Sequence, residues 1–493
     1  MTSSNRVRVS YVMESTPGVT PTTPRMKQVR LTGESLSGAP EYVDSDELRD
    51  DRMNADPIMV GQTSGGGINF ELSYPHPQSF VSDGLRAALF SDWLNTPERD
   101  NDGTADSVIT AVAGTTDEFT VTTGAAFVAN HLLRATGFAT AANNGVWKVT
   151  TGGTTSVAVL GANLVTEAAP PATARLKVVG FEGASADITA LADGLGSTAL
   201  DFTTLGLRKG QWIKIGGTAD ATTFAFLVTA GAVARAAAWA RVTDIAAGKL
   251  TLDNLPSGWS TDVGTGKTIR VWFGDQLKNG VTPAPMTIER GFMGQQVPAY
   301  IVNRGMQAGQ LELTMEAKQK ITGAFTFTGL TASQGTVTLD ASPDPATTNQ
   351  VMAGSANVGR LAEGGSRLTS PNWARRVSFT VNANLEAQDA VDNFGAVYIR
   401  EGENTVTGQI DTYFGSNAVL QKFYDGTVTS LNGRVAKNNQ AVVIQIPRAT
   451  LRGGGNPSAG GKNQTVTAQF DFSGALDPET GANIIFDRLE YFA

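Results

Sequence analysis

The sequence has no cysteine and only two histidines among its 493 residues. The lack of cysteine excludes disulfide frameworks, thiolate zinc sites and cysteine nucleophiles. His76 lies between two prolines, and His131 has no second histidine near it in the sequence, so histidine metal sites and histidine-based catalysis are nearly excluded. We expect no cofactor and no metal.

Long apolar runs are also missing. No stretch of 18 apolar residues occurs, and residues 1–10 contain no apolar segment of the kind found in signal peptides. We therefore expect no membrane segment and no export signal, and a protein that folds in the compartment that makes it.

Charged side chains are scarce, at 17% of the chain, whereas glycine is abundant, with 55 residues. The net charge is −8. Affinity for nucleic acid depends on Lys and Arg that displace counterions, so this chain is not expected to hold a phosphate backbone. A composition rich in Gly, Thr, Ala, Val and Asn favours strands and tight turns.

Strand patterns dominate the chain. Apolar and polar residues alternate strictly over 311–317, and the same period of two recurs at 68–72, 325–327 and 377–381. Two short helices are expected as well. One begins near Ser82 and carries Leu85, Ala88, Leu89 and Trp93 on one stripe, and the other carries Val419, Leu420 and Phe423.

Part of the sequence is duplicated. Residues 321–329 match residues 466–474 position by position, at an offset of 145. Upstream, Val29–Thr32 resembles Val377–Thr380, and the strand and helix after Ile68 resemble those after Val406, at offsets near 340. The fall in offset means that the first copy contains about 195 residues that the second lacks.

The inserted residues form a tandem pair. Three strand patterns, at 132–137, 146–150 and 176–180, recur 80 to 93 residues later. Residues 104–275 contain 12 basic and 13 acidic side chains, so the duplicated part carries −7 of the net charge. Two small all-β modules, Ig-like or SH3-like, are expected here.

The predicted fold is mainly β. We expect two β-sandwich or barrel domains, each with a short helix, and two small all-β modules inserted into the first. The predicted domains are 1–103 with 276–340 for the first copy, 104–183 and 184–275 for the modules, and 341–493 for the second copy.

Enzymatic motifs are weak. Residues 264–268, Gly-Thr-Gly-Lys-Thr, look like the end of a phosphate-binding loop, but Thr261 stands where the first glycine is required and a strand pattern follows instead of a helix. Acidic pairs such as Glu401 with Glu403 are expected to be solvated loop charges. We expect no catalytic residues.

The densest block of charge lies between two strand patterns. Its candidate contact residues are Glu41, Asp44, Asp46, Glu47, Arg49, Asp50, Asp51 and Arg52. A loop of about 30 residues without its own core is usually functional or disordered. Two interpretations stay open: a solvated loop, or an arm that docks on a neighbouring subunit or ring.

Several segments, in their order along the chain, resemble the tail tube proteins of bacteriophages with long, non-contractile tails. They are residues 30–36, 46–52, 83–89, 287–292, 384–385, 394–396, 422–427, 430–431 and 477–488. The resemblance covers residues 1–103 and 276–493 and departs at the insert. The arrangement is similar to that of phages of the Chi type.

This resemblance implies a structural virion protein, assembled in the host cytoplasm and located in the tail, where stacked rings surround a lumen that conducts double-stranded DNA. With four lumen strands per tube domain and two domains per chain, trimeric rings are expected in preference to hexamers. Three chains would give about 24 strands and a backbone diameter of roughly 48 Å. Implied partners are other copies of the chain, tape-measure, tail-terminator and tail-tip proteins, DNA passing without specific contacts, and a host surface receptor for the inserted modules.

Alternation along the strands selects the polar side chains that face the bore if their apolar neighbours face a core. The candidates for the lumen surface are Asn69, Glu71, Glu312, Thr314, Glu316, Gln409 and Asp411. Two other functions stay open: another viral shell or baseplate protein, and a carbohydrate-binding adhesin or enzyme with accessory β-domains.

Overall fold

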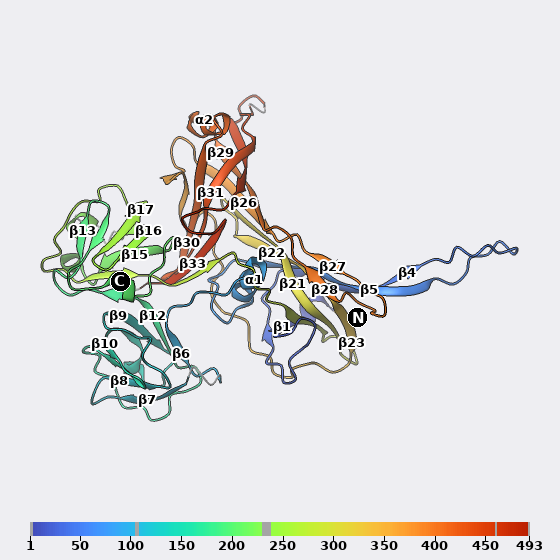
Figure 1. Ribbon diagram of the computed structural model, residues 1–493, viewed down its shortest axis with the longest axis horizontal. Helices are drawn as coiled ribbons and strands as arrows, with labels where there is room; N and C mark the ends of the chain where they lie inside the picture. The colour runs from blue at the N-terminus through green and yellow to red at the C-terminus, as the bar shows by residue number, and fades with distance from the viewer. Residues whose placement is uncertain (1–2, 104–107, 229–237, 459–460, 492–493) are drawn as a thin grey trace.

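The computed structural model describes residues 3–103, 108–228, 238–458 and 461–491 (Figure 1). It is mainly β, with one 18-stranded sheet, one 13-stranded sheet and a two-stranded hairpin. Neither α-helix of these residues has the length and apolar character needed to span a membrane. The predicted boundary at 103/104 adjoins residues outside the described ranges.

The first repeat is formed by the N-terminal strands, α1 and the strands that follow the insert. Its elements are β1 (Val7–Met13), β2 (Lys27–Gln28), β3 (Gly33–Glu34), β4 (Ser37–Val43), β5 (Ile58–Glu71), α1 (Phe80–Leu89), β20 (Met286–Phe292), β21 (Ala299–Glu316), β22 (Thr322–Gly329) and β23 (Thr331–Gly335).

The second repeat is contiguous in the sequence. Its elements are β24 (Val358–Glu363), β25 (Ser366–Arg367), β26 (Ala374–Asn382), β27 (Glu386–Gln388), β28 (Tyr398–Arg400), β29 (Thr405–Tyr413), α2 (Ala418–Tyr424), β30 (Val428–Lys437), β31 (Gln440–Gly454), β32 (Thr467–Gly474) and β33 (Ile485–Glu490).

The two repeats share one connectivity. Six antiparallel pairings of the first repeat recur in the second. In the first repeat they are β1–β20, β20–β21, β21–β22, β22–β5, β5 with β3 and β4, and β21–β23. Their equivalents in the second repeat, in the same order, are β24–β30, β30–β31, β31–β32, β32–β29, β29–β26 and β31–β33. The duplication inferred from the sequence is therefore present in the fold.

The pairings also set the register of the repeat. Phe325 and Phe470 occupy equivalent positions, as the offset of 145 predicts, and both are buried. The match of Val29–Thr32 with Val377–Thr380 is out of register, because Glu34 pairs with Ile68 where Val377 pairs with Ile410. The equivalent offset is 343. Residues 29–32 precede β3, whereas residues 377–380 lie within β26, so the matched segments are not equivalent.

The insert lies between α1 and β20 and forms the 13-stranded sheet. Its elements are β6 (Glu98–Asp100), β7 (Ile109–Ala113), β8 (Glu118–Val121), β9 (His131–Thr136), β10 (Gly145–Gly152), β11 (Ser156–Val159), β12 (Arg175–Glu182), β13 (Thr189–Leu191), β14 (Gly194–Gly196), β15 (Trp212–Gly217), β16 (Ala238–Ala246), β17 (Lys249–Asp253) and β18 (Ile269–Trp272), followed by β19 (Asp275–Lys278).

Both halves of the insert place the predicted tandem strands in the same way. In the first, β9 pairs with β10 and β12, and in the second β15 pairs with β16 and β18. A β12–β18 ladder joins the halves, so their apolar side chains form one cluster of buried residues. Residues 264–268 form a turn in which Lys267 pairs with Asp262, so no helix begins there.

The helices cover equivalent aromatic side chains of the two repeats. Ser79, not Ser82, caps α1 by accepting a hydrogen bond from the backbone of Ser82, and Trp93 lies beyond the end of the helix. Phe80 of α1 meets Phe325 edge-on at 5.7 Å between ring centroids. In the second repeat, Phe423 of α2 lies 6.4 Å from Phe470.

Gly84 allows the close approach of α1 to the sheet, since a Cβ at this position would lie 2.6 Å from the ring of Phe325. We expect Gly84→Val to lower the free energy of unfolding by about 2 kcal/mol, because overpacking a buried contact forces the backbone or the ring to move. Scanning calorimetry measures the shift. Gly216→Val is the matched control, because a Cβ at Gly216 meets open space in a strand. An equal effect of both substitutions would contradict the packing argument.

Candidate assembly surfaces

Nine strands of the two repeats form one sheet, called here the long sheet, in which β3 and β4 together occupy one edge position. Its order is β3 and β4, then β5, β22, β21, β26, β29, β32 and β31. The repeats meet at the β21–β26 ladder, where Gln310–Glu316 pairs with Arg376–Asn382. One face of this sheet packs on the helices and the outer strands, and its apolar residues belong to one buried cluster.

The predicted lumen side chains lie on the opposite face of the long sheet. Their neighbours along each strand, among them Ile68, Leu313 and Ile410, are buried in the core. Asn69, Glu312 and Glu316 are exposed, and Glu71, Thr314, Gln409 and Asp411 are half-buried. The structure therefore brings all seven residues to one uncovered face. That this face surrounds a bore stays a prediction.

Small polar side chains and carboxylates dominate this face. Hydroxyl and amide residues on it are Thr322, Thr326, Ser378, Thr380, Asn382, Thr405, Thr407 and Ser473. Its carboxylates are Glu71, Glu312, Glu316, Asp411 and Asp471. Arg376 is paired across the strands with Glu316 and Asp411, and Lys320 forms an ion pair with Glu71. The face is mildly acidic.

Asp411 is a carboxylate of this face whose hydrogen bonding is incomplete. Its Oδ1 is buried and finds no hydrogen-bond partner among the described residues. Burial raises the pKa of Asp411, the nearby carboxylates of Glu316 and Asp471 raise it further, and Arg376 opposes them. The sequence pattern identified this residue but could not indicate its unsatisfied oxygen, which depends on cross-strand neighbours.

The long sheet has two open edges in the described residues. The segment 33–38 pairs only with β5, whereas its equivalent β26 pairs on both sides. At the other end, Gly453 and Gly454 pair only with β32, whereas the equivalent part of β21 pairs with both β22 and β26. Each repeat therefore has one paired edge, at the β21–β26 ladder, and one open edge, and the open edge of each repeat is equivalent to the paired edge of the other.

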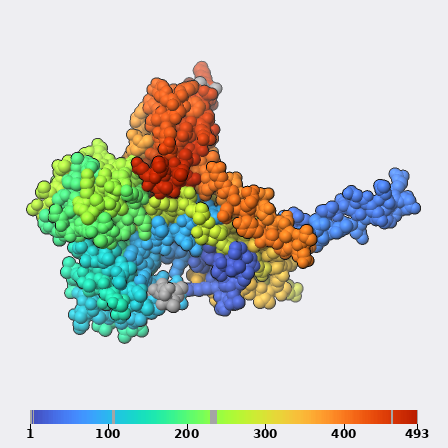
Figure 2. Space-filling view, viewed as in Figure 1, coloured from blue at the N-terminus to red at the C-terminus, as the bar shows by residue number. Residues whose placement is uncertain are grey.

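The predicted arm extends from one end of the long sheet as the hairpin of β4 and β5, residues 39–63 (Figures 1 and 2). The eight candidate contact residues from Glu41 to Arg52 are exposed, and Arg49 pairs with Asp51 at 2.6 Å. Figure 2 shows the blue arm reaching well beyond the body of the subunit.

The arm also exposes apolar side chains that the charge pattern did not reveal. They are Tyr42, Val43, Leu48, Met53, Ile58, Met59 and Val60, with Leu48 99% and Met53 70% exposed. The apolar run Ile58-Met59-Val60 is the sequence feature that could have predicted this exposed apolar surface. Exposed apolar residues on an extended hairpin indicate a surface that another molecule covers.

The second repeat has a hairpin in the equivalent position, formed by β27 and β28 between β26 and β29. This hairpin folds back over the first repeat. Leu385 packs at Gly309, and Tyr398 and Ile399 line an apolar cavity of about 280 Å³ together with Leu330. The arm of the first repeat has no equivalent surface to cover within the described chain.

A family model described as phage tail tube protein matches the chain twice, over residues 4–267 and 253–474. A search of curated proteins finds no match.

We expect Asp411→Asn to raise the unfolding temperature at pH 7 by on the order of 1 °C. A carboxyl whose folded-state pKa is raised loses stability as pH rises from its unfolded pKa through its folded pKa, so the gain should vanish near pH 3. Thermal unfolding at both pH values measures it. Glu312→Gln, which removes an exposed carboxylate of the same face, should change little, and an equal gain for Asp411→Asn at both pH values would contradict the argument.

Proposed function

This chain belongs to the phage tail tube protein family, and on that premise we propose that three copies close into a ring around a lumen that conducts double-stranded DNA. The observation that carries the proposal is the pair of complementary open edges on a duplicated sheet. Family membership already makes the protein a structural component of the virion tail. The alternatives of a different shell protein or of an adhesin have no comparable support.

The internal β21–β26 ladder is the template for the contact between subunits. If the same ladder joins neighbouring copies, residues 453–458 of one copy pair with residues 33–38 of the next. An open strand edge is an aggregation hazard, and ring closure removes it. Three copies then form a barrel of about 24 strands with a backbone diameter of roughly 48 Å.

The uncovered face of the long sheet suits the wall of this lumen. Its hydroxyl and amide side chains hydrate well, and its carboxylates repel phosphate, so a moving duplex meets few contacts that would slow it. DNA conduction remains a proposal, as do the long, non-contractile tail, the likeness to Chi-type phages and the tape-measure, terminator and tip partners. Host-surface contact through the inserted modules is likewise a prediction of the sequence.

The arm is proposed to dock on a copy of this chain in the adjacent ring. Residues 44–56 contain six acidic and two basic side chains. A hollow of about 340 Å³ lies at the opposite end of the strands, where β21 ends at Glu316 and β26 begins. It is lined by Trp373, which is 54% exposed, by Glu316, and by Arg360, Arg367, Arg375 and Arg376. Opposite charges at opposite ends favour head-to-tail stacking.

Electron microscopy of assembled tubes tests ring closure. We expect three chains per ring, with six similar long-sheet segments around the lumen and strand pairing between residues 453–458 and 33–38. Rings of six chains, or long sheets that face the outside of the tube, would refute the proposal.

A paired substitution tests the arm. Leu48→Ser with Met53→Ser should leave the exposed arm folded but raise the subunit concentration needed for tube formation at least about tenfold, because each apolar side chain contributes roughly 1.5–3 kcal/mol when buried. Sedimentation of tubes measures this. Trp373→Ser should have the same effect if the arm docks there. Leu160→Ser with Val263→Ser, which are exposed apolar residues of the insert, is the control, and normal assembly of the arm variant would exclude the docking.

A further inference from the structure

The insert leaves and re-enters the first repeat, yet it docks on the second (Figure 1). An interface cluster joins Leu132, Val179, Trp212 and Trp272 of the insert to Ala441, Val443 and Leu489 of the second repeat, all of them buried. A module that only decorated the surface would need no such interface.

The strand at the exit of the insert completes the outer sheet of the second repeat. Asp275–Lys278 of β19 pairs with Ile485–Arg488 of β33 in four antiparallel positions, and only then does the chain continue into β20 of the first repeat. The exit strand of the insert therefore supplies an edge strand to the second repeat, more than 200 residues later in the sequence.

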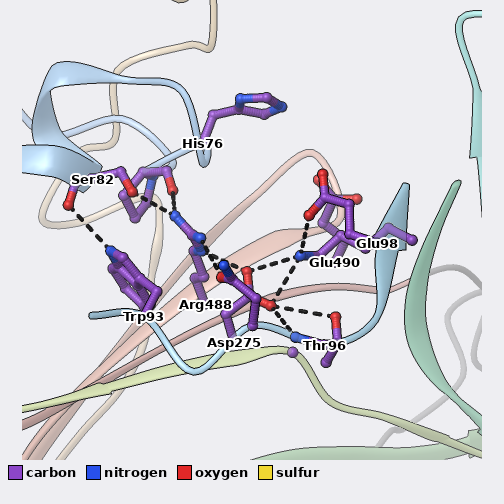
Figure 3. A network of polar contacts seen from close by, with 12 residues as sticks. His76, Ser82, Trp93, Thr96, Glu98, Asp275, Arg488 and Glu490 are labelled. Atoms are coloured by element: carbon purple, nitrogen blue, oxygen red, sulfur yellow. Dashed lines mark hydrogen bonds and ion pairs between the residues drawn. The ribbon is translucent and has the colours of Figure 1, made fainter. Parts of the chain in front are cut away.

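A buried polar network lies where the insert meets both repeats (Figure 3). Arg488 of β33 donates to Asp275 at 2.8 Å, and both side chains are only 1% exposed. Lys177 of the insert donates to the same carboxylate at 2.9 Å and to Glu98 at 3.0 Å. Burial would raise the pKa of Asp275, but Lys177 and Arg488 outweigh it and hold the pKa below its ordinary value.

The same arginine also reaches the first repeat. Arg488 donates from Nη1 to the hydroxyl of Ser82 in α1 and to the carbonyl of Pro75, both at 2.7 Å, and its guanidinium lies 4.0 Å from the ring centroid of Trp93. One buried side chain of the second repeat thus contacts the helix of the first repeat and, through Asp275, the root of the insert.

Half-buried contacts extend this interface outward. Arg434 of the second repeat lies 4.3 Å from the ring centroid of Trp239, which also meets Tyr491 edge-on at 5.6 Å. Arg360 donates to the side chain of Asn254 at 2.7 Å. These insert side chains lie outside the buried core cluster of the insert itself.

Outside the insert, the repeats meet at the β21–β26 ladder, at the β27–β28 hairpin that packs on the first repeat, and where Arg488 contacts α1. The twist between two paired strands varies by tens of degrees among proteins, so the ladder by itself does not fix the angle between the repeats. We propose that the insert is a brace that fixes the angle between the two repeats and, given the proposed ring, its curvature. The brace attaches to the first repeat by its two chain connections and to the second by the interface cluster and the β19–β33 ladder.

Spin labels on the soluble subunit test the brace without requiring tube assembly. The chain has no cysteine, so Gln334→Cys in the first repeat and Gln421→Cys in the second give unique labels at exposed positions. We expect a narrow distance distribution in the parent chain. Trp239→Ala with Asn254→Ala, which removes brace contacts and leaves no buried charge, should broaden it at least twofold.

Trp147→Ala is the matched control. Trp147 is a half-buried indole of the other module that packs on the core of the insert, 6.0 Å from Phe119. It should leave the distribution unchanged. An unchanged distribution in the Trp239/Asn254 variant, or equal broadening in the control, would overturn the brace. Failure of the ring proposal would show separately, as hexameric rings with a normal distribution in the soluble subunit.

A second variant probes the buried side of the interface. Asp487 of β33 accepts from the backbone N–H of Trp212 at 3.1 Å, from Gln276 at 3.1 Å and from Gln445 at 3.3 Å. Burial raises its pKa to about 7, with Lys278 and Arg208 opposing at longer range. The brace should therefore loosen as pH rises from about 4 to 7, and Asp487→Asn should remove this dependence of the label distances. A dependence that persists in Asp487→Asn would refute this role of the interface.

Discussion

The architecture depends on the pairing of strand edges. Backbone N–H and C=O groups need partners, and an open edge either recruits another strand or has to be protected. Within this chain the two repeats satisfy one pair of edges against each other at β21–β26, and the duplication leaves one complementary edge at each end of the long sheet. The proposed ring follows from repeating the contact that the chain already makes.

The buried ionic network has a different role from the ladder. Removing charges from water is costly, so buried pairs rarely add much net stability, but a missing partner is severely destabilising. Arg488 and Asp275 can be satisfied only when α1, the root of the insert and β33 are all in place. Such a network selects one arrangement of three segments from the many that apolar packing alone would tolerate.

Much of the fold could be predicted from the sequence because its strands are half-buried. Alternation placed Glu312, Gln409 and five other polar residues on one face, and all seven lie on the uncovered face of the long sheet. The equivalence of Phe325 and Phe470 was predicted from the similarity of the two sequence segments that contain them. The register near Val29 was wrong, because Val29–Thr32 precedes the strand that is equivalent to β26, and four similar residues do not fix a register.

The docking of the insert could not have been predicted in the same way. Its contacts join residues such as Trp212 and Asp487 that lie 275 positions apart, and neither stands in a periodic pattern that points to the other.

The duplication shows why one repeat can carry an insert that the other lacks. The second repeat closes the same connection with only the residues between Tyr424 and Val428, so the insert is not required for the fold of one repeat. What it adds is a second attachment between the repeats, through the interface cluster and the β19–β33 ladder, which restricts rotation of the repeats about the β21–β26 ladder.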